Sequence, residues 1–94
     1  MISPGSRPRL AGKARLRFDA HSGKHLILYP ERGLELTSSA AEIARRLGAG
    51  LTVTEIVDQL VAAFGGADRT QVAADVDAFL RSLDDRGLLA RDEA

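Results

Sequence analysis

Cysteine and tryptophan are absent from this 94-residue sequence, and histidine occurs only at His21 and His25. Without cysteine, disulfides, iron–sulfur clusters, thiolate nucleophiles and most structural zinc sites are excluded. The two histidines would need Asp19 or Glu31 to complete a metal site, and a strand–turn–strand segment rarely brings such side chains to one point. We therefore expect no metal site and no cofactor, and we interpret His25 as a residue on the face of a strand.

Long apolar runs are also missing. No run approaches the roughly 20 residues needed to span a bilayer, and residues 1–10 lack the apolar block of a secretory signal. The sequence therefore predicts a cytoplasmic protein without a membrane partner. Its length predicts one small domain with a thin core.

Sequence motifs of common enzymes do not occur. There is no G-x-S-x-G, no Walker loop and no G-x-G-x-x-G. Ser38, Ser39 and Thr52 are better explained as helix caps than as nucleophiles. Four aspartates that follow the first two helices are interpreted as solvated helix acids: Asp75, Asp77, Asp84 and Asp85. We therefore predict no catalytic residue and no enzyme activity of the chain on its own.

Charge is balanced overall but is distributed unevenly along the chain. The formal net charge is zero, yet residues 1–36 contain seven basic and three acidic side chains, and residues 37–94 contain six basic and ten acidic ones. The chain is therefore polar rather than basic, and it lacks the overall positive charge typical of nucleic-acid-binding domains.

Period-two alternation indicates short strands at 14–19 and 34–36, and residues 25–29 are β-compatible and apolar on both faces, as in a central strand. Leu16 and Phe18 of the first strand are expected to face inward, as are Leu34 and Leu36 of the third. The connections are short, so we predict an antiparallel meander in which the second strand is central. In this order the third strand forms a sheet edge.

Turn residues separate these strands. Pro30 has no N–H group and ends the second strand. We place the next turn at 31–33, where Gly33 is able to take a positive φ. The segment 1–12 contains two prolines and two glycines and is predicted to be a flexible arm.

Three helices follow the strands. Ser39-x-x-Glu42 and Thr52-x-x-Glu55 have the spacing of capping boxes, and Asp68 or Thr70 can cap the third helix. Glycines at 48, 50, 65, 66 and 87 end these helices, and Leu88-Leu89 can return to the sheet. Apolar residues at helical spacing define the three buried faces: Ala40, Ile43, Ala44 and Leu47; Val53, Ile56, Val57, Leu60, Val61 and Phe64; Val72, Val76, Phe79, Leu80 and Leu83.

The fold class is therefore α+β: an N-terminal three-stranded antiparallel sheet followed by three helices, similar to a winged helix with the sheet placed first. We divide the chain into an arm at 1–12, a single domain at 13–90 and a tail at 91–94.

DNA binding is one functional interpretation, because the second and third helices resemble a helix-turn-helix pair. The third helix, however, has four aspartates against Arg69, Arg81 and Arg86, and Gln71 is its one amide side chain. A net-negative helix is repelled by phosphates. A winged-helix DNA-binding regulator is kept as an alternative, and a purely structural subunit of a larger assembly as another.

Peptide binding is the second interpretation. A short edge strand has free N–H and C=O groups that can pair with an added strand. Val76, Leu80 and Leu83 of the third helix are either core residues or share their surface with a groove beside Leu34 and Leu36, and periodicity leaves both open. An open edge and glycine-rich hinges also allow strand exchange, so the chain is expected to be a monomer or a strand-swapped homodimer.

Several segments in this order resemble coenzyme PQQ synthesis protein D, the PqqD family. These are His25–Gly33, Leu34-x-Leu36, Ser39–Ile43, Thr52-Val53-x-Glu55-Ile56-Val57 and Asp75-Val76-x-x-Phe79-Leu80-x-x-Leu83-x-x-x-Gly87-Leu88, with Arg7–Leu10 similar to the family's opening. The resemblance covers about residues 7–89. One departure is Gly48-Ala49-Gly50, where the family often has an acidic residue before a single glycine.

The resemblance implies a peptide chaperone in pyrroloquinoline quinone biosynthesis. Members of the family bind the precursor peptide PqqA by strand addition and present it to the radical-SAM enzyme PqqE. Carried onto this sequence, the resemblance implies a peptide-binding groove between the third strand and the third helix, formed by Gly33, Leu34, Glu35, Leu36, Thr37, Val72, Asp75, Val76, Phe79, Leu80 and Leu83.

Overall fold

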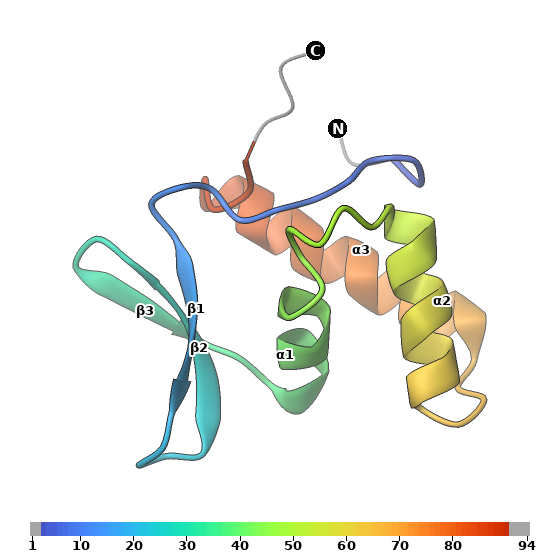
Figure 1. Ribbon diagram of the computed structural model, residues 1–94, viewed down its shortest axis with the longest axis horizontal. Helices are drawn as coiled ribbons and strands as arrows, with labels where there is room; N and C mark the ends of the chain where they lie inside the picture. The colour runs from blue at the N-terminus through green and yellow to red at the C-terminus, as the bar shows by residue number, and fades with distance from the viewer. Residues whose placement is uncertain (1–2, 91–94) are drawn as a thin grey trace.

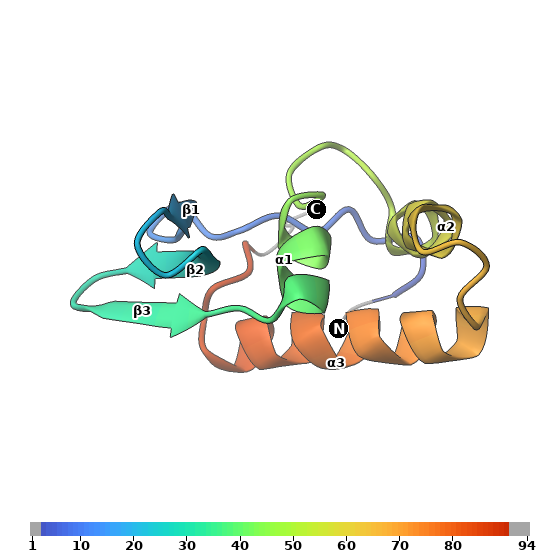
Figure 2. The same cartoon turned by 90° about the horizontal axis from the view of Figure 1, so that it is seen from below.

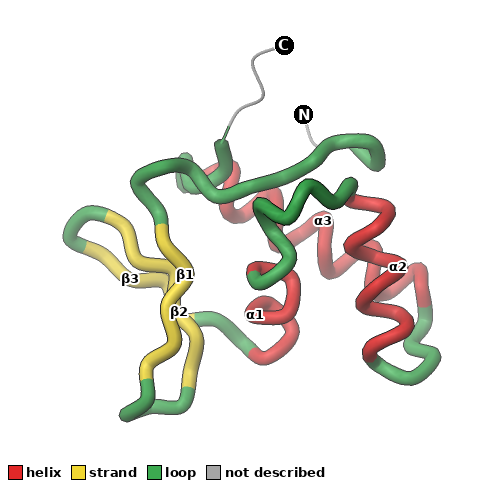
Figure 3. The backbone as a smooth tube through the Cα atoms, viewed as in Figure 1, coloured by secondary structure: helices red, strands yellow, loops and turns green. Residues whose placement is uncertain are grey.

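A computed structural model describes residues 3–90 (Figure 1). Three strands come first and three helices follow, which confirms the predicted α+β order (Figure 3). The elements are β1 (Arg15–Asp19), β2 (Lys24–Tyr29), β3 (Arg32–Glu35), α1 (Ser38–Ala44), α2 (Val53–Ala63) and α3 (Arg69–Asp85). No helix among the described residues is long and apolar enough to cross a membrane.

The sheet is an antiparallel meander with β2 in the centre, as predicted. Ile27 of β2 lies opposite Leu16 of β1 and Leu34 of β3. Directly opposite residues point to the same face of a sheet, so these three side chains form the face that packs on the helices. Ile27 is completely buried, and Leu16 and Leu34 are half-buried against the core.

The helices stack in layers beside the sheet. In Figure 2, β3 and α3 lie in one layer, β1 and α2 lie in the opposite layer, and α1 lies between α3 and the outer loops. The side chains that are almost completely buried come from β2, from α2, from α3 and from the segment after α3: Ile27, Ile56, Leu60, Val76, Leu80, Leu83 and Leu88. One apolar core therefore joins the sheet to all three helices.

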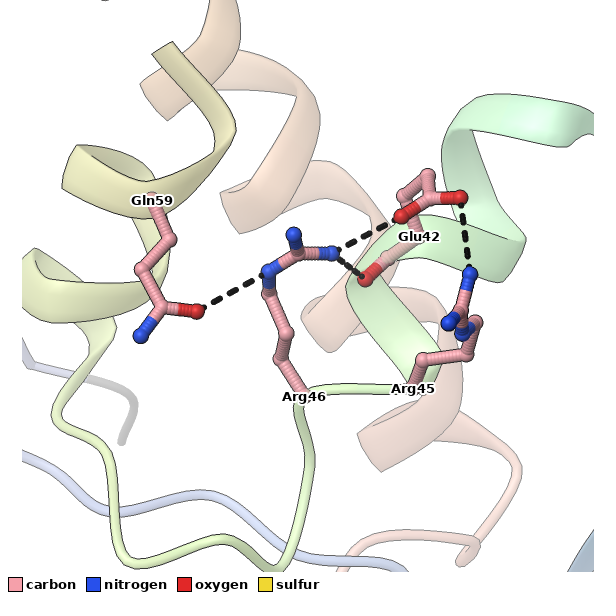
Figure 4. Close-up of polar contacts among 4 residues, drawn as sticks. All are labelled: Glu42, Arg45, Arg46 and Gln59. Atoms are coloured by element: carbon pink, nitrogen blue, oxygen red, sulfur yellow. Dashed lines mark hydrogen bonds and ion pairs between the residues drawn. The ribbon is translucent and has the colours of Figure 1, made fainter. Parts of the chain in front are cut away.

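The first helix begins earlier than the sequence predicts. Thr37, not Ser39, is its N-cap, and the Thr37 hydroxyl accepts the N–H of Ala40 at 3.1 Å. Glu42 therefore makes no capping box. Its carboxylate instead accepts hydrogen bonds from Arg45 and Arg46, at 3.2 and 2.9 Å (Figure 4).

This cluster links the end of α1 to α2. The Arg46 guanidinium also donates to the Glu42 carbonyl at 2.8 Å and to the Gln59 side-chain oxygen of α2 at 3.1 Å (Figure 4). The Arg46 hydrogen bond is the main cause that holds the pKa of Glu42 below its ordinary value. α1 ends at Ala44, before the predicted glycine stop, and irregular turns continue to Gly48.

The other two caps follow the sequence pattern. Thr52 and Glu55 form the predicted capping box, with the Thr52 hydroxyl accepting the Glu55 N–H and the Glu55 carboxylate accepting the Thr52 N–H. The Thr52 N–H is the main cause that lowers the pKa of Glu55. Asp68, rather than Thr70, caps α3.

Two predictions about turns and ends are wrong. The positive φ in the β2–β3 turn belongs to Glu31, at 63°, whereas Gly33 lies within β3 opposite Leu28. Pro30 fixes the first turn position, so the bend comes one step earlier than expected. Leu89 does not return to the sheet. It pairs with Leu10 of the N-terminal arm in an antiparallel bridge.

Two phenylalanines that were assigned to buried faces are exposed. Phe18 is 55% exposed because the β1–β2 hairpin extends beyond the helices (Figure 1), and its ring lies 5.0 Å from the His25 ring. Phe64, the C-cap of α2, is 47% exposed. Periodicity assigns a residue to a face but does not show where the covering element stops.

The N-terminal segment that the sequence predicts to be a flexible arm lies across the helices in the described part of the chain (Figure 1). Its carbonyl groups at Ser6 and Pro4 accept the N–H groups of Val53 and Thr54, and that of Pro8 accepts the Gly48 N–H. The division into an arm at 1–12, a domain at 13–90 and a tail at 91–94 stays a prediction. Residues 91–94 lie outside the described residues.

Candidate functional site

The outer edge of β3 carries backbone groups that the sheet does not use. The Leu36 N–H donates to the His25 carbonyl at 2.9 Å, which fixes the phase of the β2–β3 ladder. Hydrogen-bonded pairs alternate with non-bonded pairs along an antiparallel ladder. Leu34 therefore directs its backbone groups toward Ile27, and Gly33 and Glu35 direct theirs away from β2. These two residues offer two N–H and two C=O groups to an added strand.

Side chains at the end of this edge are charged. Lys24 Nζ lies 2.6 Å from Glu35 Oε1, and the hydrogen bond that Lys24 donates to Glu35 raises the pKa of Lys24. A cavity of about 260 Å³ lies beside this ion pair, lined in part by Glu35, Leu36 and Thr37. Three of the five predicted site residues at positions 33–37 thus line this cavity.

The predicted residues of α3 divide into two groups. Val72, Val76, Leu80 and Leu83 are buried in the core. Asp75 is exposed and accepts a hydrogen bond from Gln71 at 2.8 Å, and Phe79 is half-buried against the core. Periodicity left open whether Val76, Leu80 and Leu83 are core residues or share their surface with a groove. In the structure all three are buried in the core. Only Asp75 and Phe79 offer substantial surface to a ligand.

A second cavity, of about 230 Å³, opens between the three helices. Three of the predicted α3 residues line it, namely Val72, Asp75 and Val76, together with Ser39 of α1 and Phe64 at the end of α2. Sequence analysis did not connect Ser39 or Phe64 with a site. The one available signal was Phe64 itself, a large apolar residue directly before the helix-ending Gly65-Gly66.

The candidate metal residues are dispersed. His21 is exposed in the β1–β2 turn, where its N–H donates to Asp19, and His25 packs against Phe18. Glu31 lies in the turn at the other end of β2. Within residues 3–90, no three His, Asp or Glu side chains come together as metal ligands.

The arginines of α3 are largely engaged in ion pairs. Arg69 Nη1 lies 2.5 Å from Asp58 Oδ1 of α2, and Arg81 Nε lies 2.8 Å from Asp77 Oδ2. The surface of α3 also carries the exposed acids Asp75, Asp84 and Asp85. Engaged cations and surplus carboxylates do not suit a helix that enters a DNA groove.

Comparison with known proteins identifies the family. The family model for "Coenzyme PQQ synthesis protein D (PqqD)" matches residues 24–89, which include all of β2 to α3. The chain belongs to the PqqD family. The match contains every predicted site residue on β3 and α3 and ends at Leu89, the partner of Leu10.

Individual relatives agree with membership of the PqqD family. The chain is 40% identical over 95 residues to the PqqA binding protein of Rhodopseudomonas palustris (strain BisB5), covering 99% of this chain and 92% of that protein. It is similar to the solution NMR structure of the PqqD truncation of Methylobacterium extorquens PqqCD, at 32% identity and a TM-score of 0.82, covering 97% and 96% of the two chains. That structure is of a ribosomally synthesized and post-translationally modified peptide recognition element.

The fold also occurs in a solved protein of lower identity. TbiB1, solved in complex with the TbiA(beta) leader peptide, is 23% identical with a TM-score of 0.75, and the match covers 92% of this chain and 99% of that one. At this identity the likeness concerns the fold alone. It shows that three strands followed by three helices form one recurring arrangement.

Proposed function

We propose that this protein is a peptide chaperone of pyrroloquinoline quinone biosynthesis that binds the precursor peptide PqqA as a fourth strand on β3. The observation that carries the proposal is the phase of the β2–β3 ladder, which turns the backbone groups of Gly33 and Glu35 outward. An extended peptide gains affinity from such main-chain bonds and specificity from pockets for alternate side chains. The cavity lined in part by Glu35, Leu36 and Thr37 borders this edge.

The comparisons support a peptide ligand. The relative from R. palustris is named for binding PqqA, and the M. extorquens domain is described as a functional, stand-alone recognition element. TbiB1 and a lasso peptide synthetase B1, which share the fold, were solved with their leader peptides. The R. palustris and M. extorquens proteins are named for peptide binding and recognition, and we propose the same non-catalytic role here.

Presentation to the radical-SAM enzyme PqqE in the cytoplasm is the second part of the proposal. A carrier must hold one part of the peptide and leave another part free to enter the enzyme. Two outward-facing residues give a paired segment of about four residues, and with a few buried side chains this suits a micromolar complex, about −8 kcal/mol. A complex of this affinity can release the peptide after each presentation to the enzyme.

The direct test is a titration of the ¹⁵N-labelled protein with synthetic PqqA, followed by NMR and amide hydrogen exchange. Strand addition should slow exchange of the Gly33 and Glu35 amides strongly, whereas the Leu34 amide, already bonded to β2, should change little. Binding without protection at Gly33 and Glu35 would place the peptide elsewhere. Absence of any binding would remove the proposed function.

The same sample tests the DNA alternative. A duplex titrated at low salt should leave the spectrum unchanged, because the exposed side of α3 carries unbalanced carboxylates. Steeply salt-dependent shifts along α3 would instead favour a regulator.

A further inference from the structure

The cavity between the three helices has an apolar floor and a polar rim. Its floor is formed by Ile43, Leu60, Phe64, Ala67, Val72 and Val76. Ser39, Asp68, Gln71 and Asp75 complete the lining. Most of this floor belongs to the buried core, yet Phe64 is 47% exposed, so the cavity opens to solvent beside its ring.

The size of the cavity selects one kind of occupant. About 230 Å³ is below the range of about 300–1,000 Å³ typical of small-molecule sites. An apolar cavity of about 150 Å³ is enough to hold a benzene ring. One leucine-sized or aromatic side chain therefore suits this space, and its burial would remove apolar surface from water on both partners.

The place of the cavity connects it to the β3 edge. Ser39, which lines the cavity, follows Glu35 by only four residues. In Figure 1 the start of α1 lies between the end of β3 and the loop that joins α2 to α3. A strand that leaves the edge past Thr37 therefore reaches the mouth of the cavity by passing the first turn of α1.

We propose that this cavity holds an apolar side chain of the same precursor peptide, located a few residues N-terminal to the segment that pairs with β3. This inference rests on the proposed function. Every pairing in the sheet is antiparallel, and an antiparallel guest begins beside the C-terminal end of β3. Its N-terminal extension then runs toward Ser39, and its C-terminal part runs away from the cavity.

The polar rim of the cavity also favours certain residue types beside the inserted side chain in the peptide, the anchor residue. Asp68 and Asp75 place two carboxylates at the opening, and no lining residue is basic. Acidic residues beside the anchor are therefore disfavoured, whereas peptide N–H groups or a basic side chain can meet the free carboxylate oxygens. A second copy of this protein, inserting its exposed Phe18, is the competing occupant.

The test uses Ala67→Leu, which fills the cavity from the half-buried end of the α2–α3 loop, and Ala73→Leu as the matched control on the exposed surface of α3. Each protein is titrated with full-length PqqA and with peptides shortened stepwise from either end. Ala67→Leu should weaken binding of the full-length peptide about tenfold or more, and Ala73→Leu should leave it unchanged. A peptide shortened from its N-terminus past the anchor should bind wild type and Ala67→Leu equally.

Outcomes separate this inference from the proposed function. If the Gly33 and Glu35 amides are protected but Ala67→Leu binds every peptide like wild type, the edge is correct and the cavity proposal fails. If shortening PqqA from its C-terminus, and not from its N-terminus, removes the difference in affinity between wild type and Ala67→Leu, the proposed direction of the peptide is wrong. Concentration-dependent dimerisation that Ala67→Leu abolishes would assign the cavity to a second copy. Phe64→Ala, which removes an exposed wall, supplies the same comparison if Ala67→Leu does not fold.

Discussion

The Leu36 N–H donates to the His25 carbonyl at 2.9 Å, and this one hydrogen bond determines which residues of β3 can pair with an added peptide strand. It assigns the inward bonds to Leu34 and Leu36 and the outward ones to Gly33 and Glu35. Proline substitutions at the neighbouring positions Leu34 and Glu35 should therefore affect different properties, the first stability and the second peptide binding. Proline lacks the N–H and is tolerated in an edge strand only where that group faces away from the sheet.

Glu35→Pro should fold but fail to bind PqqA, because it removes an outward donor. Its free energy of unfolding should lie within about 1 kcal/mol of that of Glu35→Ala, which controls for the lost Lys24 ion pair. Leu34→Pro should lose about 3 kcal/mol or more, because it removes a ladder bond and a packed side chain. Urea unfolding and peptide titration measure both effects. Full affinity in Glu35→Pro would exclude pairing at this edge.

Leu83 and Phe79 separate core packing from ligand contact. Leu83 is completely buried and lines neither cavity, so Leu83→Ala should lower the free energy of unfolding by about 3 kcal/mol and leave peptide affinity nearly unchanged. Phe79 is half-buried, and Phe79→Ala should reduce affinity for PqqA as well as stability. Val76→Glu cannot distinguish these roles, because an unpaired buried carboxylate unfolds the domain. Equal loss of affinity in both alanine variants would contradict the division.

Acid should weaken this fold, because the pKa values of Glu42 and Glu55 lie below their ordinary value of 4.5. A depressed pKa in the folded state means that the unfolded chain binds protons more readily. The stabilisation is thus fully present above the unfolded pKa of 4.5 and is lost as pH falls through the lower folded values. Urea unfolding midpoints measured from pH 7 to pH 3 should show this loss.

Arg46 and Arg45 provide a matched pair for the Glu42 part of this effect. Arg46 makes the hydrogen bond that lowers the pKa of Glu42 most, and the attraction of Arg45 contributes less. Arg46→Gln should therefore raise the pKa of Glu42 further toward 4.5 than Arg45→Gln does. Carboxyl ¹³C NMR titration measures both pKa values. The reverse order would assign the effect to Arg45.

The sequence predicted the strand order and the edge because these depend on local signals. Short connections favour antiparallel pairing of neighbouring strands, and the apolar residues on both faces of 25–29 identify the central strand. Two of three helix starts also follow from local chemistry, at Thr52 and Asp68. The third fails because Ser39-x-x-Glu42 has the capping spacing, yet Thr37 lies earlier and Arg45 and Arg46 engage the glutamate.

The candidate site could be predicted only in part. Period-two alternation locates the residues of β3, but the direction of their backbone groups depends on the ladder phase, which no single strand reveals. Helical periodicity groups Val76 with Phe79, although only the packing of α1 over α3 decides which side chain stays accessible. The cavity beside Ser39 and Phe64 joins three helices, so no local pattern could indicate it.

The N-terminal arm completes the start of α2, a role that its proline- and glycine-rich sequence does not suggest. The first N–H groups of a helix have no partner within the helix. Here the Val53 N–H donates to the Ser6 carbonyl at 2.9 Å and the Thr54 N–H donates to the Pro4 carbonyl at 3.2 Å. Deleting residues 1–6 returns both donors to water and should lower the free energy of unfolding by about 1–2 kcal/mol.

Peptide affinity should not change in that deletion variant, because the hydrogen bonds that residues 3–6 make with the helices and strands go to the start of α2 and not to β3. Thr52→Ala is the matched control, since it removes another partner of the same helix start and should cost about 1 kcal/mol. Urea unfolding and PqqA titration of both variants measure the two quantities separately. Loss of affinity in the deletion variant but not in Thr52→Ala would show instead that the arm itself contacts the peptide.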